Sequence, residues 1–348
     1  MADKVILAEP RGFCAGVEMA IKALTWMVQV FEGPVYCFHE IVHNADVVAA
    51  FERAGVVFID DIVDAPPGSP VMLSAHGSAP DVVAAAEGRS AIMVDAVCPL
   101  VTKVHHEIKR MAADDFDIIY VGHHGHDEAM GAVAEAPDSV RLIDPDSGLG
   151  GYTPRDPKKV ALVAQTTLGF FEWESVLSAA TIAFPDLHTA RKSDLCYATT
   201  NRQEATIALA RQATLILVVG SENSSNTQAL VRVARLQGVE AHRVSGLDEI
   251  DPEWLVGHKV VGVTAGASAP DQRLREVIDA IDPKDGVELL SVTNEDEYFP
   301  LPPALRQLII SLQYLVEGGF AAQGPHRSGP MQADRDHTAT ESLDLLAL

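Results

Sequence analysis

The chain has 348 residues, 47% of them hydrophobic and 22% charged, which is enough for more than one folded core and unlike a disordered polypeptide. Asp and Glu number 49 against 26 Lys and Arg, and the net charge of −23 argues against a nucleic-acid-binding surface and against attachment to anionic lipid. The N-terminal residues lack a signal-peptide pattern, and no apolar run approaches the roughly 20 residues that span a bilayer. We therefore expect a soluble, cytoplasmic protein with no nucleic-acid or membrane partner.

Short apolar runs alternate with helix-period segments along most of the chain, a pattern typical of parallel α/β proteins. The predicted strands lie at 4–8, 71–74, 91–95, 118–121, 160–164, 215–219 and 260–264. Helices are predicted after Cys14, Cys98 and Cys196. Pro99 suits a first helical position, and Thr200 with Gln203 would form a capping box for the last of these helices.

Three of the four cysteines share one setting. Cys14, Cys98 and Cys196 each lie in a turn that opens a helix, and the first two turns follow a strand directly. Their separations of 84 and 98 residues match the size of a small α/β unit. HGSAPD at 76–81 and GASAPD at 266–271 are a second pair of similar segments. We expect three similar small α/β units with mainly parallel sheets, arranged pseudo-threefold with the cysteine turns facing a shared centre.

The expected boundaries of the units follow from these repeated segments. The first unit is 1–97, including the N-terminal strand and the Cys14 turn, the second is 98–195 and the third is 196–285. A C-terminal segment, 286–310, is expected to pack on the core. The tail, 311–348, mixes Gly, Pro, His and acidic residues without sustained periodicity, so we expect it to be largely disordered, with at most a short terminal helix.

Polar segments follow several predicted strands, at the edge where open α/β sheets bind their ligands. They are 74–78, 122–128, 220–226 and 264–268, with His43 and Asn44 after a shorter apolar run. Taken singly, each segment is better explained as a helix N-cap than as a ligand site. Together they favour an anion site, because helix N-termini bind phosphate. The sequence has neither a P-loop nor a well-placed G-x-G-x-x-G, so a small phosphorylated metabolite fits better than a nucleotide.

The cysteines and histidines leave several kinds of site open. His123, His124 and His126 are close in sequence but lack regular zinc-ligand spacing. The cysteines can be buried reduced thiols, as we expect for Cys37 within a strand. Thiolates are also favoured at helix N-termini, and an iron–sulfur cluster held by only three of them leaves one iron open to a substrate oxygen. Glu128 is either a proton donor or a surface carboxylate.

Six segments, read in order, strongly resemble the 4-hydroxy-3-methylbut-2-enyl diphosphate reductases from about residue 4 to about residue 305. They are RGFCAGV (11–17), VDAVCPLVTKVH (94–105), QTTL (165–168), CYATTNRQEA (196–205), GSENSSN (220–226) and VTAGASAP (263–270). The resemblance implies a three-unit α/β fold around one [4Fe–4S] cluster per chain. It also implies reductive removal of the substrate hydroxyl as water, giving isopentenyl and dimethylallyl diphosphates, the last step of the methylerythritol phosphate route to isoprenoids.

The resemblance assigns roles to individual residues. Cys14, Cys98 and Cys196 would hold three irons and leave the fourth open to the substrate hydroxyl. Thr166 would lie near that hydroxyl and Glu128 would supply its protons. The residues implied around the diphosphate are His43, His76, His126, Ser224, Ser225, Asn226 and Ser268. The chain has no obvious flavin or nicotinamide site, so a ferredoxin or flavodoxin is the expected electron donor.

The chain departs from the family pattern next to the implied proton donor. Asp127 stands between His126 and Glu128 where the family usually has proline, and Glu9 stands where it often has Asn. Two other interpretations remain: a non-catalytic iron–sulfur protein that binds a small phosphorylated metabolite, and a metal-free α/β hydrolase or transferase with core cysteines. Glu128 with Thr166 favours the enzyme, because a binding protein needs neither a proton donor nor a hydroxyl-orienting group.

Overall fold

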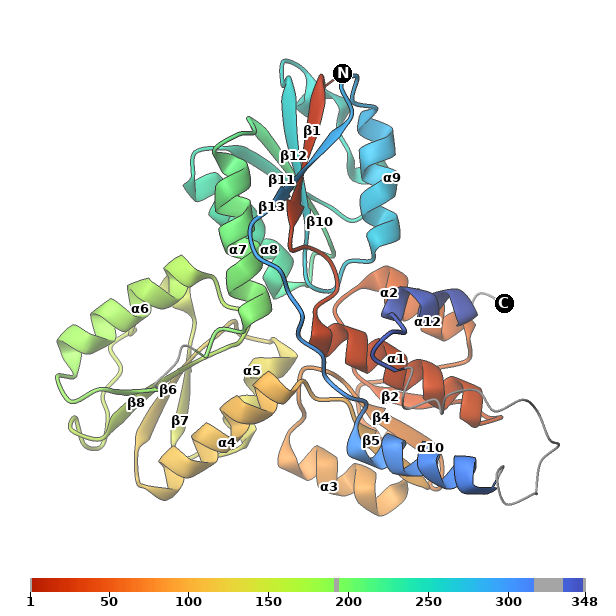
Figure 1. Ribbon diagram of the computed structural model, residues 1–348. Helices are drawn as coiled ribbons and strands as arrows, with labels where there is room; N and C mark the ends of the chain where they lie inside the picture. Colours follow the sequence, from red (N-terminus) through yellow and green to blue (C-terminus); the bar gives the residue numbers. More distant parts are fainter. Residues whose placement is uncertain (1, 191–193, 316–333, 347–348) are drawn as a thin grey trace. The chain divides into compact units, whose positions relative to one another are not determined.

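The computed structural model describes residues 2–190, 194–315 and 334–346 (Figure 1). The chain forms two compact units. Unit 1 consists of Met1–Cys14 and Leu100–Asp296, and unit 2 of Ala15–Pro99 and Glu297–Leu348. Unit 1 contains two parallel sheets, A and C, and unit 2 contains the parallel sheet B. Among the described residues, no helix combines the length and the apolar character needed to cross a membrane.

Sheet A of unit 1 has five parallel strands in the order β11-β10-β12-β1-β13. Its strands are β1 (Lys4–Glu9), β10 (Leu215–Val219), β11 (Glu240–Val244), β12 (Val260–Ala265) and β13 (Val287–Ser291). Alternate residues of the central strands point to opposite faces, and both faces are covered. Helix α9 (Asp271–Ile281) packs on the face that carries Val5 and Leu7. Helices α7 (Tyr197–Ala210) and α8 (Ser225–Leu236) pack on the face that carries Ile6 and Ala8.

Sheet C of unit 1 has four parallel strands in the order β7-β6-β8-β9. They are β6 (Asp117–Val121), β7 (Val140–Ile143), β8 (Val160–Ala164) and β9 (His188–Thr189). Helix α6 (Phe170–Ala183) covers one face, whereas α4 (Pro99–Ala113) and α5 (Asp127–Ala134) cover the other. Short 3-10 helices lie at Pro145–Ser147 between β7 and β8, and at Leu247–Glu249 and Pro252–Leu255 between β11 and β12.

Sheet B of unit 2 has four parallel strands in the order β3-β2-β4-β5. They are β2 (Tyr36–Phe38), β3 (Val57–Ile59), β4 (Pro70–Leu73) and β5 (Ile92–Asp95). The helices among the described residues of this unit are α1 (Ala15–Val30), α2 (Ala45–Arg53), α3 (Pro80–Arg89), α10 (Pro303–Leu315) and α12 (Ala339–Leu346), with a 3-10 turn at Ile62–Asp64. Helix α12 packs on α1 and α2, and the Ala339 N–H donates to Glu18 Oε2 at 2.6 Å (Figure 1).

The three predicted parallel-sheet α/β units are confirmed, and each predicted strand is present. The position of the first strand differs from the prediction, which grouped it with residues up to 97. β1 instead lies in sheet A between β12 and β13, where its apolar side chains are covered on both faces. A strand that is apolar on both faces can be buried in any parallel sheet. Its position in the chain therefore does not determine which sheet it joins. Of the predicted tail, 316–333 and 347–348 lie outside the described residues, and α12 occupies Ala339–Leu346.

Candidate active site

The polar segments of sheet A meet at the carboxyl ends of neighbouring strands. β12 lies between β10 and β1, and the chain turns toward a helix after each of the three. The Gly266 N–H, just after β12, donates to Val219 O at the end of β10 at 2.9 Å. The Cys14 N–H, beyond β1, donates to Ala267 O at 3.2 Å. The Cys14 turn, segment 264–268 and the loop before α8 are therefore neighbours.

Two glycines allow helix α8 to begin close to this edge. A Cβ atom added at Gly220 would lie 2.3 Å from Thr227 Oγ1, and one added at Gly266 would lie 2.1 Å from the same atom. Since real Cβ atoms do not approach other atoms so closely, any side chain at either position would push the first turn of α8 away from the strand ends. Close packing against Thr227 therefore explains the glycines at Gly220 in GSENSSN and Gly266 in VTAGASAP.

The predicted anion-binding residues of unit 1 lie around the N-terminus of α8. Ser224 caps the helix, with its Oγ accepting the Thr227 N–H at 3.3 Å. Ser225 and Asn226 follow in the first turn, and Ser268 is buried in the turn after β12. A helix N-terminus offers unpaired N–H groups and the positive end of the helix dipole. This arrangement suits a phosphate group.

Asn226 also links this helix to its surroundings through both ends of its amide. Its Oδ1 accepts the Ala267 N–H at 2.9 Å, and its Nδ2 donates to Thr199 Oγ1 at 3.3 Å. Thr199 in turn contacts the sulfur of Cys196, with its N–H at 3.3 Å and its hydroxyl at 3.0 Å. The helix that carries the predicted anion site is thus connected by hydrogen bonds to a predicted cluster ligand.

Glu128, Thr166 and Cys196 form one hydrogen-bonded chain. Glu128 is 2% exposed and lies in the first turn of α5. Its Oε1 accepts the Thr166 N–H at 2.7 Å and its Oε2 accepts the Thr166 hydroxyl at 3.0 Å. The carbonyl oxygen of Thr166 accepts the Cys196 N–H at 3.0 Å. Three residues predicted to serve one reaction therefore lie side by side.

His126 precedes Glu128 as the N-cap of α5. Its Nδ1 accepts the Glu128 N–H at 3.2 Å, which in a neutral ring leaves Nε2 to carry the proton. α5 begins at Asp127, a position that suits proline because its missing N–H costs nothing there, and suits an acid because of the helix dipole. The departure from the family pattern therefore keeps the helix start, and Glu128 keeps both of its hydrogen bonds to Thr166.

Cys14 and Cys196 lie close enough to affect one another electrostatically. Cys196 is the N-cap of α7, and its sulfur accepts the Thr199 N–H in the first turn of the helix. Burial, with a smaller contribution from the nearby Cys14, raises the pKa of the Cys196 thiol to about 11. Metal ions reverse this effect, because a coordinating thiol loses its proton outright. Paired thiols at helix starts, with N–H and hydroxyl donors around a sulfur, fit an iron–sulfur cluster.

Helix α7 begins one turn before the predicted capping box. The sulfur of Cys196 takes the capping role, so Thr200 lies inside the helix and its hydroxyl donates back to Tyr197 O at 3.0 Å. The predicted Thr200–Gln203 box is therefore wrong. Cysteine is not among the residues usually considered as N-caps, so the prediction from the sequence placed the helix start one turn too late.

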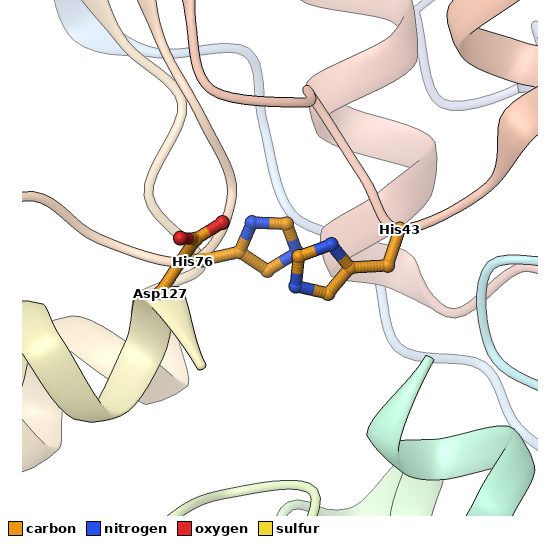
Figure 2. A group of neighbouring side chains, drawn as sticks. All are labelled: His43, His76 and Asp127. Atoms are coloured by element: carbon orange, nitrogen blue, oxygen red, sulfur yellow. The ribbon is translucent and has the colours of Figure 1, made fainter. Parts of the chain in front are cut away.

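Unit 2 carries the other predicted site residues. The Cys98 N–H donates to Ala75 O at 3.0 Å, which ties the Cys98 turn to the residue before His76. The rings of His76 and His43 are stacked, with centroids 3.8 Å apart and an interplanar angle of 13° (Figure 2). Cys37 is fully buried in β2, where burial raises the pKa of its thiol, in agreement with the predicted core role.

Sequence reasoning missed Gln165, which is fully buried at the end of β8. Its Nε2 donates to Thr167 Oγ1 at 2.8 Å and to Ser225 Oγ at 3.3 Å, and its Oε1 accepts the His123 N–H at 3.0 Å. Gln165 therefore joins the end of sheet C to the start of α8. Its place in QTTL, directly after a predicted strand, was the available signal.

Comparison with known proteins shows the family of this chain. A family model described as LytB protein matches residues 5–282. The 4-hydroxy-3-methylbut-2-enyl diphosphate reductase of Mycolicibacterium vanbaalenii is 44% identical over 306 residues, covering 87% of this chain and 91% of that protein. A protein of Mycobacterium tuberculosis with the same name, numbered 2, has the same identity and coverage. The chain belongs to the LytB family.

Solved structures agree with the family assignment. The E-1-hydroxy-2-methyl-but-2-enyl-4-diphosphate reductase from Plasmodium falciparum matches with a TM-score of 0.86 at 30% identity, covering 90% of this chain and 100% of that one. A second structure, of (E)-4-hydroxy-3-methyl-but-2-enyl diphosphate reductase, the terminal enzyme of the non-mevalonate pathway, matches with a TM-score of 0.56 at 28% identity. That match covers 81% of this chain and 99% of the other.

Proposed function

We propose that this chain is a 4-hydroxy-3-methylbut-2-enyl diphosphate reductase. It converts (E)-4-hydroxy-3-methylbut-2-enyl diphosphate to isopentenyl diphosphate and dimethylallyl diphosphate, the terminal step of the non-mevalonate pathway. The observation that carries this proposal is the hydrogen-bonded chain from Glu128 through Thr166 to Cys196. It joins a buried acid and a hydroxyl group directly to a residue of the expected metal centre.

The cofactor of this proposal is a [4Fe–4S] cluster, one per chain. Cys14, Cys98 and Cys196 would hold it and leave one iron without a protein ligand. When bound, the cluster supplies electrons and an open Lewis-acidic iron for the substrate hydroxyl. Two electrons come from a protein partner, for which a ferredoxin or flavodoxin is our expectation.

The chain's own residues bind and orient the substrate. The N-terminus of α8, with Ser224, Ser225 and Asn226, holds the diphosphate together with Ser268 and His126. His43 and His76 are assigned to the same diphosphate on the family resemblance alone. Because this part of the substrate does not react, its binding energy orients the hydroxyl at the other end.

Proton delivery falls to Glu128 and Thr166. Thr166 Oγ1 lies 3.0 Å from Glu128 Oε2. When Glu128 is protonated, its O–H donates to the Thr166 hydroxyl oxygen and the Thr166 hydroxyl turns to donate to the substrate oxygen. A proton from Glu128 then replaces the proton that Thr166 passes to the leaving oxygen. The C–O bond breaks and the oxygen leaves as water. Two electrons and a second proton, added at one or the other end of the allyl group, give dimethylallyl or isopentenyl diphosphate.

Anaerobic turnover tests the proposal directly. The purified protein, reconstituted with iron and sulfide, is mixed with (E)-4-hydroxy-3-methylbut-2-enyl diphosphate, a chemical reductant and a viologen mediator. We expect isopentenyl and dimethylallyl diphosphates, with two electrons consumed per substrate. Binding of the substrate without either product would refute the proposal and leave a non-catalytic binding protein.

A further inference from the structure

Arg202 is a fully buried arginine near the proposed cluster site. It lies in α7, the helix that begins after Cys196, and its side chain is 1% exposed. Burying a guanidinium group is costly unless its N–H donors find partners. Its partners therefore indicate what the residue does.

One side of the guanidinium holds the turn before Cys14. Arg202 Nε and Nη2 donate to Gly12 O at 3.2 and 2.8 Å, and Nη2 lies 3.5 Å from Phe13 O. The other side binds α7 and a later segment. Nη1 donates to Ala198 O at 3.0 Å and to the two carboxylate oxygens of Glu295 at 2.9 and 3.1 Å.

The Cys14 turn is fixed from its other side by sheet A. Gly12 has a φ of +64°, a conformation that favours glycine. The Gly12 N–H donates to Ala265 O at 3.4 Å, and the Cys14 N–H donates to Ala267 O at 3.2 Å. The turn therefore has its N–H groups bound by the end of β12 and the segment that follows it, and its carbonyl groups bound by Arg202.

We propose that Arg202, neutralised by Glu295, is a positioning residue that sets the placement of Cys14 relative to Cys196. The guanidinium ties the carbonyl groups before one thiol to the helix that begins at the other. The inference rests on the proposed function, because it takes both thiols as cluster ligands. It predicts that the two thiols are pre-arranged before iron and sulfide bind.

Lysine cannot replace this arginine. The guanidinium is a planar fork whose donors point in two directions, whereas an ammonium group is a single point of charge. Arg202→Lys keeps the charge but cannot hold Gly12 O and both Glu295 oxygens together. Replacing a buried ion pair with apolar residues is often neutral for stability. Arg202→Met with Glu295→Leu therefore removes the tie to the Cys14 turn without leaving a buried charge.

Arg235, which is exposed whereas Arg202 is buried, provides a control for the arginine–carbonyl contact in the same unit. Its Nε and Nη2 donate to Ala241 O at 3.1 and 2.8 Å, nearly the geometry that Arg202 makes with Gly12 O. It lies in the last turn of α8 and holds the carbonyl of a β11 residue. Arg235→Met therefore removes a comparable arginine–carbonyl contact at a place remote from the cysteine turns.

The experiment compares wild type, Arg202→Met/Glu295→Leu, Arg202→Lys and Arg235→Met after anaerobic reconstitution. The readouts are the melting temperature of the cluster-free protein, the rate of iron loss to a chelator and the EPR spectrum of the reduced cluster. We expect the double variant to lose iron about 10- to 100-fold faster than wild type with an altered EPR spectrum, as for other outer-sphere metal-site changes. Arg235→Met should behave as wild type. Arg202→Lys should lose iron at an intermediate rate, and it carries the test if the double variant does not fold.

Two results would overturn the inference in distinguishable ways. If both Arg202 variants keep iron as long as Arg235→Met and give the wild-type spectrum, Arg202 has no positioning role. If the wild-type protein itself binds no iron and sulfide, the proposed function fails and the inference fails with it.

Discussion

Replacing Glu128 with glutamine separates proton delivery from substrate positioning. In the structure both carboxylate oxygens accept hydrogen bonds from Thr166, at 2.7 Å from its N–H and 3.0 Å from its hydroxyl. Glutamine has nearly the same shape, so its carbonyl oxygen can still accept the Thr166 N–H. Its amide nitrogen can donate to the hydroxyl oxygen, but it cannot release a proton at neutral pH.

The expected loss follows from the role of the carboxyl group. A positioned general acid contributes about 10²- to 10⁴-fold to a rate, which corresponds to about 3–5 kcal/mol of activation free energy. We therefore expect Glu128→Gln to lower kcat by this factor while substrate affinity and iron content stay near wild type. A loss confined to kcat is the signature of an interaction made only in the transition state.

The assay is anaerobic oxidation of a reduced viologen, with iron content and substrate binding measured on the same preparations. Glu135→Gln is the control, because Glu135 is a buried carboxylate just after α5 that contacts His105 rather than Thr166. It should leave kcat unchanged. A Glu128→Gln enzyme with kcat within about threefold of wild type would refute the assignment of Glu128 as the proton source.

Three further predictions concern the surroundings of the site. Gly266→Ala places a Cβ 2.1 Å from Thr227 Oγ1. This variant should lower the free energy of unfolding, measured with denaturant, by about 1–3 kcal/mol, and it should raise KM. An unchanged KM would contradict the close approach of α8 to the strand ends. Asp127→Pro should keep kcat within about twofold, because α5 begins at this residue; a large loss of turnover would show that the charge is needed. Burial lowers the pKa of His105, although Glu135 opposes the shift. The contribution of neutral His105 to the stability of the folded protein is therefore present above about pH 6.5 and is lost as the pH falls. Melting temperatures between pH 8 and pH 5 should therefore fall less for His105→Gln than for wild type, and equal slopes would argue against this account.

Much of the fold follows from hydrophobic patterning. Strands such as Leu215–Val219 and Val160–Ala164 are apolar on both faces because helices cover both faces of a parallel sheet. The strands that were not predicted are short, such as β9 with two residues, or carry charged residues, such as β11 and β13. Their pairing depends on neighbouring strands that local sequence does not identify. The same limit applies to β1, whose sheet is formed by strands more than 200 residues later.

The site residues divide in a similar way. Glu128 was singled out in a polar segment after a predicted strand and Thr166 through the family resemblance, and the structure brings them into contact. Gln165 and Arg202 were not singled out, because a buried polar side chain has no distinctive local pattern. Their roles depend on partners far away in the chain, such as Ser225 for Gln165 and Gly12 for Arg202.

The central claim is that three cysteines hold a four-iron cluster with one iron available to the substrate. A Mössbauer spectrum of protein reconstituted anaerobically with ⁵⁷Fe, recorded with and without the hydroxymethylbutenyl diphosphate, tests it most directly. We predict about four irons per chain, with the signal of about one of them changing when the substrate is added. A chain that binds no iron, or a cluster whose spectrum is identical with and without substrate, would contradict the account.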